Sequence, residues 1–163
     1  MQNDFFSLYD QNFTHVCRYV YFKTGNQWDT DDLVSEIFRK AFEKFHTLQG
    51  SSQAWLMAIA RNTVSDHYRR KKEVLAGDEN LDRYAYASSF EELFIRKEEL
   101  HCLKKSLQSL SKEELEIINL KYFAELKYRE IGTLLGKSVG AIKMKSWRII
   151  QKLGELMQRC LEG

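Results

Sequence analysis

The sequence predicts an all-α protein built from two small helical domains and a flexible acidic linker, the C-terminal domain being a helix-turn-helix. The 163 residues include no proline and only eight glycines, a composition that favours helices throughout. Apolar residues recur at intervals of three and four along most of the chain. Charge is also segregated: residues 61–72 and 137–152 are basic, whereas residues 73–101 are acidic, which suggests two nucleic-acid contacts held apart by a linker.

Residues 1–72 are expected to form the first domain, of three helices. The first helix spans Asp4–Lys23 and closes at Gly25. The second covers residues 30–45, with Asp29 as its N-cap, and the third covers Gln53–Lys72. Each helix has one apolar stripe that is predicted to be buried against the other two. In the first helix it is Phe5, Tyr9, Phe13, Val16, Cys17 and Val20, and in the second Leu33, Val34, Ile37, Phe38, Ala41, Phe42 and Phe45. In the third helix it is Trp55, Leu56, Ile59, Thr63 and Val64.

Residues 73–90 show no clear period and are interpreted as the linker. The second domain, residues 91–163, begins with a helix over about 91–108. Ser111 and Glu114 then form a capping box. The helix that this box opens carries the apolar residues Leu115, Ile117, Ile118, Leu120 and Tyr122.

Residues 128–153 predict two short helices joined by a tight turn. Gly132 and Gly136 stand where the helices approach and where the chain turns, and Ser138 is a plausible N-cap for the second helix. That helix has an apolar stripe of Val139, Ile142, Ile149, Ile150 and Leu153. It also carries Lys137, Lys143, Lys145, Arg148 and Lys152 without an acid between them. A basic second helix favours entry into the DNA major groove over a hairpin whose lysines are merely solvated.

Other classes of function have weaker support. The cysteines Cys17, Cys102 and Cys160 lack metal-ligand spacing, so neither a zinc site nor a disulfide framework is indicated, and they are expected to be small core or partly buried hydrophobes. No catalytic or metal-binding pattern appears, and no cofactor is expected. The absence of a signal peptide and of a long apolar run predicts a cytoplasmic protein without membrane insertion. A two-domain repressor stays open as an alternative, although it would not explain residues 29–72.

Both domains resemble parts of bacterial sigma factors. DTDDLVSEIFRKAFEKF (29–45) and AWLMAIARNTVSDHYRRKK (54–72) are similar to the promoter-melting domain, and residues 107–153 are similar to the C-terminal domain. Two such domains joined by a short linker resemble the extracytoplasmic-function group. The resemblance implies a non-enzymatic sigma factor that binds core RNA polymerase through the clamp coiled coil and the flap. It further implies recognition of −10 and −35 promoter elements and help in melting DNA, and leaves open whether an anti-sigma factor also binds.

The resemblance also assigns roles in the first domain. It implies a polymerase-binding face of Asp32, Ser35, Glu36 and Arg39. The loop of residues 46–52 corresponds to the loop that receives a flipped −10 base, where His46, Gln49, Ser51 and Ser52 could hydrogen-bond to it. The IARNxxxDxxRR pattern implies −10 DNA contacts by Arg61, Asn62, Arg69 and Arg70, with Asp66 orienting neighbouring cations.

In the second domain the resemblance implies −35 recognition by Lys137, Ser138, Lys143, Lys145 and Arg148. Lys143, Lys145 and Arg148 are the best candidates, because they point away from the stripe of Ile142 and Ile149. The chain departs from the family pattern where Ser146 replaces an apolar residue. Trp147 either covers the space that Ser146 leaves or lies against DNA, and packing is slightly favoured.

Overall fold

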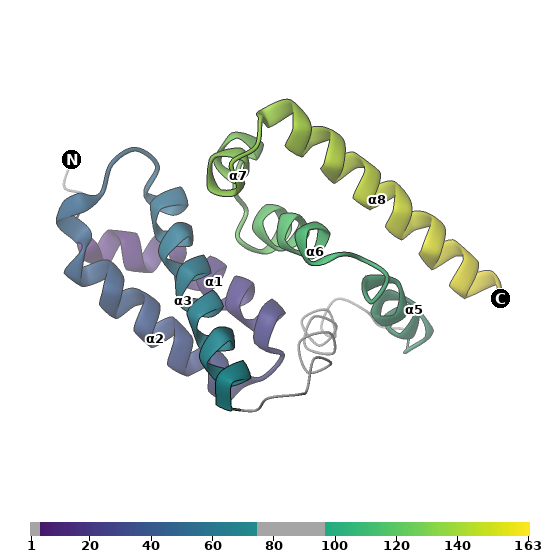
Figure 1. The fold of residues 1–163 in the computed structure, drawn as a ribbon, viewed down its shortest axis with the longest axis horizontal. Helices are drawn as coiled ribbons and strands as arrows, with labels where there is room; N and C mark the ends of the chain where they lie inside the picture. The colour runs from purple at the N-terminus through teal and green to yellow at the C-terminus, as the bar shows by residue number, and fades with distance from the viewer. Residues whose placement is uncertain (1–3, 75–96) are drawn as a thin grey trace.

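All regular structure in the described residues is helical, as the sequence predicts (Figure 1). The computed structural model describes residues 4–74 and 97–163. Its elements are α1 (Phe5–Thr24), α2 (Gln27–Glu43), the 3₁₀ turn η1 (Phe45–Thr47), α3 (Ser52–Val74), α5 (Lys97–Leu107), α6 (Lys112–Ile118), the π-helical turn η3 (Asn119–Phe123), α7 (Tyr128–Leu135) and α8 (Val139–Glu162). The expected linker of residues 73–90 lies outside the described residues except for its first two, which end α3.

Local side-chain chemistry sets the ends of α1 and α2. Asp4 caps α1 by accepting a hydrogen bond from the Ser7 N–H at 2.7 Å, and Gly25 ends it with φ +68°. The predicted Asp29 cap of α2 is wrong: α2 begins earlier, and its cap is Asn26, which accepts from the Asp29 N–H at 2.7 Å. Asp29 lies in the first turn, where its charge still favours the helix dipole.

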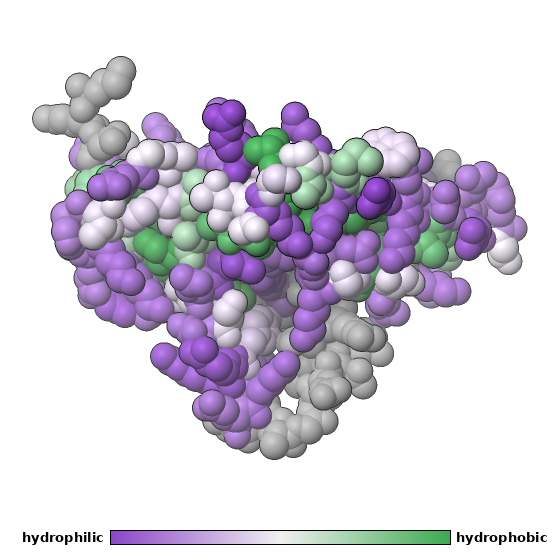
Figure 2. Space-filling model, turned by 45° about the horizontal axis from the view of Figure 1, so that its top comes forward, coloured by the Kyte–Doolittle hydropathy of each residue, from purple (hydrophilic) through white to green (hydrophobic). Residues whose placement is uncertain are grey.

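The buried faces of α1–α3 pack on one another, with side chains such as Val16, Val20, Ile37 and Leu56 fully enclosed. The prediction was wrong for Tyr9, Phe13 and Phe42, which are 37%, 39% and 65% exposed. The buried face of α1 is rotated toward Leu8, Asn12 and Tyr19, so its predicted stripe straddles the edge of the bundle. On the face in Figure 2, hydrophobic side chains form small separate areas among hydrophilic ones.

In the C-terminal half, the predicted capping box between Ser111 and Glu114 is confirmed, and Ser138 caps α8 by accepting from the Ala141 N–H at 3.1 Å. Ile142 and Ile149 are buried beneath α7 and α6. Ile150 was predicted to be buried but is 41% exposed, and Tyr122, among the apolar residues after the capping box, is 49% exposed. Both side chains lie at the edge of an apolar helix face. That face is wider than the area that the neighbouring helices bury.

The two halves share one continuous hydrophobic core. In Figure 1 the helices α1–α3 lie beside α6 and α7, and α8 runs along the outer side. The Phe22 and Phe123 rings pack across the boundary with centroids 4.9 Å apart. The carboxylate of Glu116, 9% exposed, meets the Tyr19 hydroxyl at 2.6 Å and the Lys23 ammonium at 2.5 Å. A buried charge therefore ties α6 to α1.

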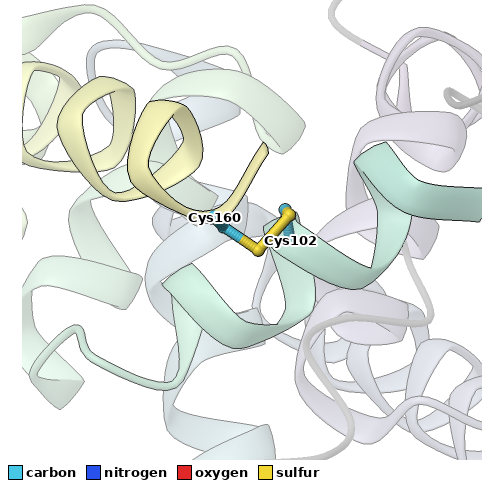
Figure 3. Close-up of a disulfide and its surroundings, with 2 residues drawn as sticks. All are labelled: Cys102 and Cys160. Atoms are coloured by element: carbon cyan, nitrogen blue, oxygen red, sulfur yellow. A yellow bond between two sulfur atoms is a disulfide. The ribbon is translucent and has the colours of Figure 1, made fainter. Parts of the chain in front are cut away.

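A disulfide joins Cys102 of α5 to Cys160 near the end of α8, with their Cα atoms 5.6 Å apart (Figure 3). The sequence-based interpretation of these residues as unpaired hydrophobes was wrong. The partners are 58 positions apart and carry no local motif, so only the packing of α5 on α8 brings them together. Cys17 is a free, half-buried thiol, in line with the prediction for it.

Within the described ranges, none of the helices combines the length and the apolar character that crossing a lipid bilayer would require.

Gly132 is expected to tolerate no side chain. A Cβ atom added there would lie 2.6 Å from the Lys137 carbonyl oxygen, which is backbone and cannot swing away. We expect Gly132→Ala to destabilise the chain by about 1–3 kcal/mol, or roughly 2–12 °C in melting temperature measured by circular dichroism. Gly154→Ala on α8 is the control: its new methyl meets open space, so helix propensity should make it neutral or stabilising. Equal melting temperatures for the two variants would contradict the close approach.

Candidate polymerase and nucleic-acid interface

The candidate polymerase-binding face of α2 is a row of exposed polar side chains with an internal ion-pair network. Asp32, Ser35 and Arg39 are exposed, and Glu36 is partly so. Arg39 donates two hydrogen bonds to Glu36, at 2.7 and 3.0 Å, and one to Glu43 at 2.6 Å. The hydrogen bond from Arg39 lowers the pKa of Glu36, which in turn raises the pKa of Arg39. The face therefore presents fixed charges over a wide pH range.

An aromatic strip beside this face was missed by sequence reasoning. It consists of Phe5, Tyr9, Phe13, Phe38 and Phe42 on α1 and α2. The Phe5 and Phe42 rings meet edge to face with centroids 5.1 Å apart, and Tyr9 lies 4.6 Å from Phe38. Phe42 follows Arg39 by three residues, so it extends the polar face with exposed apolar surface. The position of Phe42 at the edge of the predicted apolar stripe is the sequence signal that could have revealed this exposed surface.

The loop before α3 places its predicted residues in two different environments. His46 and Gln49 are exposed. Ser51 caps α3 by accepting a hydrogen bond from the Ala54 N–H at 3.2 Å, and its hydroxyl donates to Glu130 of α7. Neighbouring Gln53 donates to the Ala124 carbonyl at 2.5 Å. One end of the loop is therefore held against the C-terminal half, while its middle faces solvent.

The basic end of α3 is likewise divided. Asn62 and Arg70 are exposed, and Arg69 donates to Asp66 at 2.7 Å, the orienting role expected for Asp66. Arg61 instead faces the boundary, with its Nε 3.4 Å from the Glu116 carboxylate. A hollow of about 580 Å³ opens here between α3 and α6. Its cationic lining comes from Lys23, Arg61, Arg69, Lys72 and Lys112.

On α8 and in the turn before it, the structure separates Lys145 from Lys143 and Arg148, which the sequence analysis grouped together. Lys137 and Lys145 both contact Glu113 of α6, at 3.0 and 2.8 Å. Hydrogen bonds from Lys145 and then Lys137 lower the pKa of Glu113. Lys143 and Arg148 are exposed and have no acidic partner within the described part of the chain. No local signal could have revealed the role of Glu113, because it lies on a different helix.

Two further residues of α8 bear on this surface. Ser146 is 4% exposed and faces the core. Trp147 is 61% exposed, and the interpretation that favoured its packing was wrong. The Ser138 hydroxyl is occupied as the α8 cap, which places it at the start of the helix. Exposed Lys143, Trp147 and Arg148 therefore mark the solvent side of α8.

Comparisons with known proteins cover both halves of the chain. Residues 8–74 match the family model described as Sigma-70 region 2, and residues 100–153 match the one described as Sigma-70, region 4. Together these matches include the α2 face, the basic end of α3 and the exposed side of α8.

Individual relatives agree with these matches. The chain is 31% identical over 156 residues to the ECF RNA polymerase sigma factor BldN of Streptomyces coelicolor, covering 92% of this chain but only 59% of that protein. It is 29% identical to the RNA polymerase sigma factor SigZ of Bacillus subtilis, covering 94% and 86%. The sigma factor RpoE of Bartonella quintana, solved with the anti-sigma factor NepR, superimposes with a TM-score of 0.69. It covers 96% of this chain and 98% of that one at 19% identity, which shows a common fold.

Proposed function

The chain belongs to the extracytoplasmic-function sigma factors, with sigma-70 regions 2 and 4, and we propose that the faces described above carry out the recognition steps of this family. Members of this family are not enzymes. They direct promoter-specific transcription initiation, with core RNA polymerase and promoter DNA as partners. The single observation that supports the proposal is the presence of both regions in the family's order, with an exposed cationic side on α8.

We divide the chain into residues 1–72 for polymerase binding and −10 recognition, residues 73–90 as a linker, and residues 91–163 for −35 recognition. In the second unit, Arg148 and Lys143 are proposed to enter the major groove, since their side chains face solvent. Lys137 and Lys145 are proposed as phosphate contacts that exchange Glu113 for DNA. Ser138 would contribute through the N-terminus of α8, which it caps.

In the first unit, His46, Gln49 and Ser51 are proposed to line the site of a base flipped from the −10 element. Asn62, Arg69 and Arg70 are proposed to hold the −10 strand from the exposed side of α3. Arg61 can join them only after it leaves Glu116. The proposed contacts by Arg61 and Ser51 therefore require these side chains to leave Glu116 and Glu130, their partners in the other half of the chain.

The proposed polymerase face has a direct test. Asp32→Lys combined with Glu36→Lys should weaken co-elution with core polymerase at least ten-fold, about 1.4 kcal/mol, because two fixed negative charges become positive. The fold should survive, since buried Leu33 and Ile37 carry the packing of α2. Changing Glu155 and Glu162 of α8 to lysine is the matched control, with the same change in net charge. If both double variants co-elute equally well with core polymerase, this face is not the contact.

The proposal as a whole is tested by run-off transcription with core polymerase on a library of genomic fragments. We expect a discrete set of start sites that share −10 and −35 sequences and that disappear without the chain. A repressor would instead bind an operator tightly without polymerase and give no new start sites. That outcome would overturn the proposal.

We also propose a cytoplasmic location, where core polymerase and promoter DNA are found. An anti-sigma factor is a reasonable further partner, because the structurally similar RpoE is bound to one, NepR. Co-purification of the tagged chain from its own organism, followed by mass spectrometry, tests both points. Recovery of polymerase subunits supports the location, and recovery of a small protein that blocks run-off transcription supports the anti-sigma factor.

A further inference from the structure

The cysteine pair is the most informative feature that the proposed recognition steps do not use. Cys102 lies in α5 and is 4% exposed, while Cys160 lies in the last turn of α8 and is half-buried. Figure 3 shows the bond joining the two helices where the end of α8 passes α5. The link therefore closes the C-terminal half by tying its first described helix to its last.

The packing of α5 on α8 does not depend on this bond alone. Leu103 and Leu107 of α5 belong to the hydrophobic core, and Leu153 and Met157 of α8 pack against it. These contacts would keep the two sulfur atoms near each other if the bond were reduced. A pair held in this way can open and close without refolding, which a reversible thiol site requires.

The surroundings suit a reactive thiol. The bond lies beside a hollow of about 670 Å³ that admits small reagents. The charged side chains that line it are Lys97, Lys105, Arg159 and Glu98. Cations in excess stabilise a thiolate, which is the form that reacts with oxidants and disulfides.

We propose that Cys102 and Cys160 form a reversible thiol–disulfide site that hydrogen peroxide closes and a cellular dithiol reductant opens. Cytosolic proteins rarely keep structural disulfides, because reducing systems act on them, so a pair placed in this way fits a redox-sensing role. That compartment and the consequence for promoter binding rest on the proposed function. The chemistry of the pair does not.

The reaction balances with peroxide as the only oxidant. The more accessible Cys160 thiolate attacks one peroxide oxygen; the O–O bond breaks, giving a sulfenic acid and a hydroxide that takes up the thiol proton to become water. The Cys102 thiolate then attacks the Cys160 sulfur, the S–S bond forms, and the S–O bond breaks to release a second water with the Cys102 proton. The two sulfurs lose two electrons and the peroxide gains them. In two thiol–disulfide exchange steps a dithiol breaks the Cys102–Cys160 bond, returns both residues to thiols and becomes a disulfide itself.

The closed bond should stabilise the half of the chain that carries the proposed −35 contacts. It cross-links positions 58 residues apart, which restricts the unfolded state strongly. We expect the oxidised chain to melt roughly 8–15 °C above the reduced one. Because α8 holds Lys143 and Arg148 in its first half and Cys160 at its end, the same bond would preserve the DNA-facing helix under oxidising conditions.

The test uses the full chain, treated with one equivalent of hydrogen peroxide or with dithiothreitol. One part of each sample is alkylated in denaturant and analysed by mass spectrometry, and the other part is used unalkylated for calorimetry. Peroxide should protect Cys102 and Cys160 together, leave Cys17 open to alkylation, and raise the melting temperature. Cys17→Ser should keep this shift, whereas Cys160→Ser should lose it and melt like the reduced chain. Cys160 is the position to replace first, because it is the less buried partner.

Three outcomes would overturn the proposal: no oxidation by peroxide, pairing that involves Cys17, or a bond that a thioredoxin-type dithiol cannot reduce. Run-off transcription by both redox forms separates the redox site from the proposed function. If the thiols behave as expected but neither form supports transcription, the proposed function fails and the redox site stands.

Discussion

Replacing Arg148 with alanine should lower affinity for the cognate −35 element by about 1–3 kcal/mol, roughly five- to 150-fold, and flatten discrimination between matched and mutated sites. The structure strengthens this expectation. Arg148 is exposed and has no acidic partner in residues 4–74 or 97–163, so its planar guanidinium is available to a guanine edge. It lies two positions from Ser146, which faces the core, and so on the opposite side of α8.

The measurement is holoenzyme binding to matched and mutated −35 sites at several salt concentrations. Lys137→Ala is the companion variant. It should weaken binding to all sequences alike and reduce the salt slope by at most about one, because Glu113 already neutralises part of its charge. If Arg148→Ala leaves the ratio of matched to mutated binding unchanged, the groove is read by other residues, with Lys143 the next candidate.

The sequence predicts features that depend on neighbouring residues, but not contacts between residues far apart in the chain. The helices, the capping box at Ser111 and the turn at Gly136 depend on residues a few positions apart, and the structure confirms them. The pairing of Lys145 with Glu113 and the Cys102–Cys160 bond join distant positions with no shared motif. Only tertiary packing determines them.

The aromatic strip on α1 and α2 lies between these cases. A period of three to four residues locates an apolar stripe but not its angular limits, so Phe42 was assigned to the core although it is 65% exposed. The same uncertainty in the limits of the stripe affected Ile150, which is 41% exposed. Family resemblance could not correct it, because it transfers the roles of residues and not the orientation of each helix in this chain.

Glu116→Gln should produce the largest change in stability. Glu116 is 9% exposed, and its carboxylate lies 2.5 Å from the ammonium of Lys23, whose side chain is only 14% exposed. Glutamine keeps the size and can still accept a hydrogen bond from Tyr19, so the main loss is the counter-charge of a largely buried lysine. Removing one member of such a pair costs about 3–5 kcal/mol. We expect a fall in melting temperature of roughly 6–20 °C by calorimetry.

Glu125→Gln is the matched control, since it removes a carboxylate from the same boundary. Glu125 lies 2.5 Å from His15 but its side chain is 57% exposed, so its loss should cost less than about 1 kcal/mol. A large effect at Glu116 with a small one at Glu125 would show that buried charge, and not proximity to the boundary, holds α6 against α1. Equally small effects would mean that Lys23 finds water or another partner when Glu116 is neutral, and equally large ones would mean that Glu125 contributes as much as the buried pair. In the first case the boundary between the two halves would depend mainly on hydrophobic contacts such as that of Phe22 with Phe123.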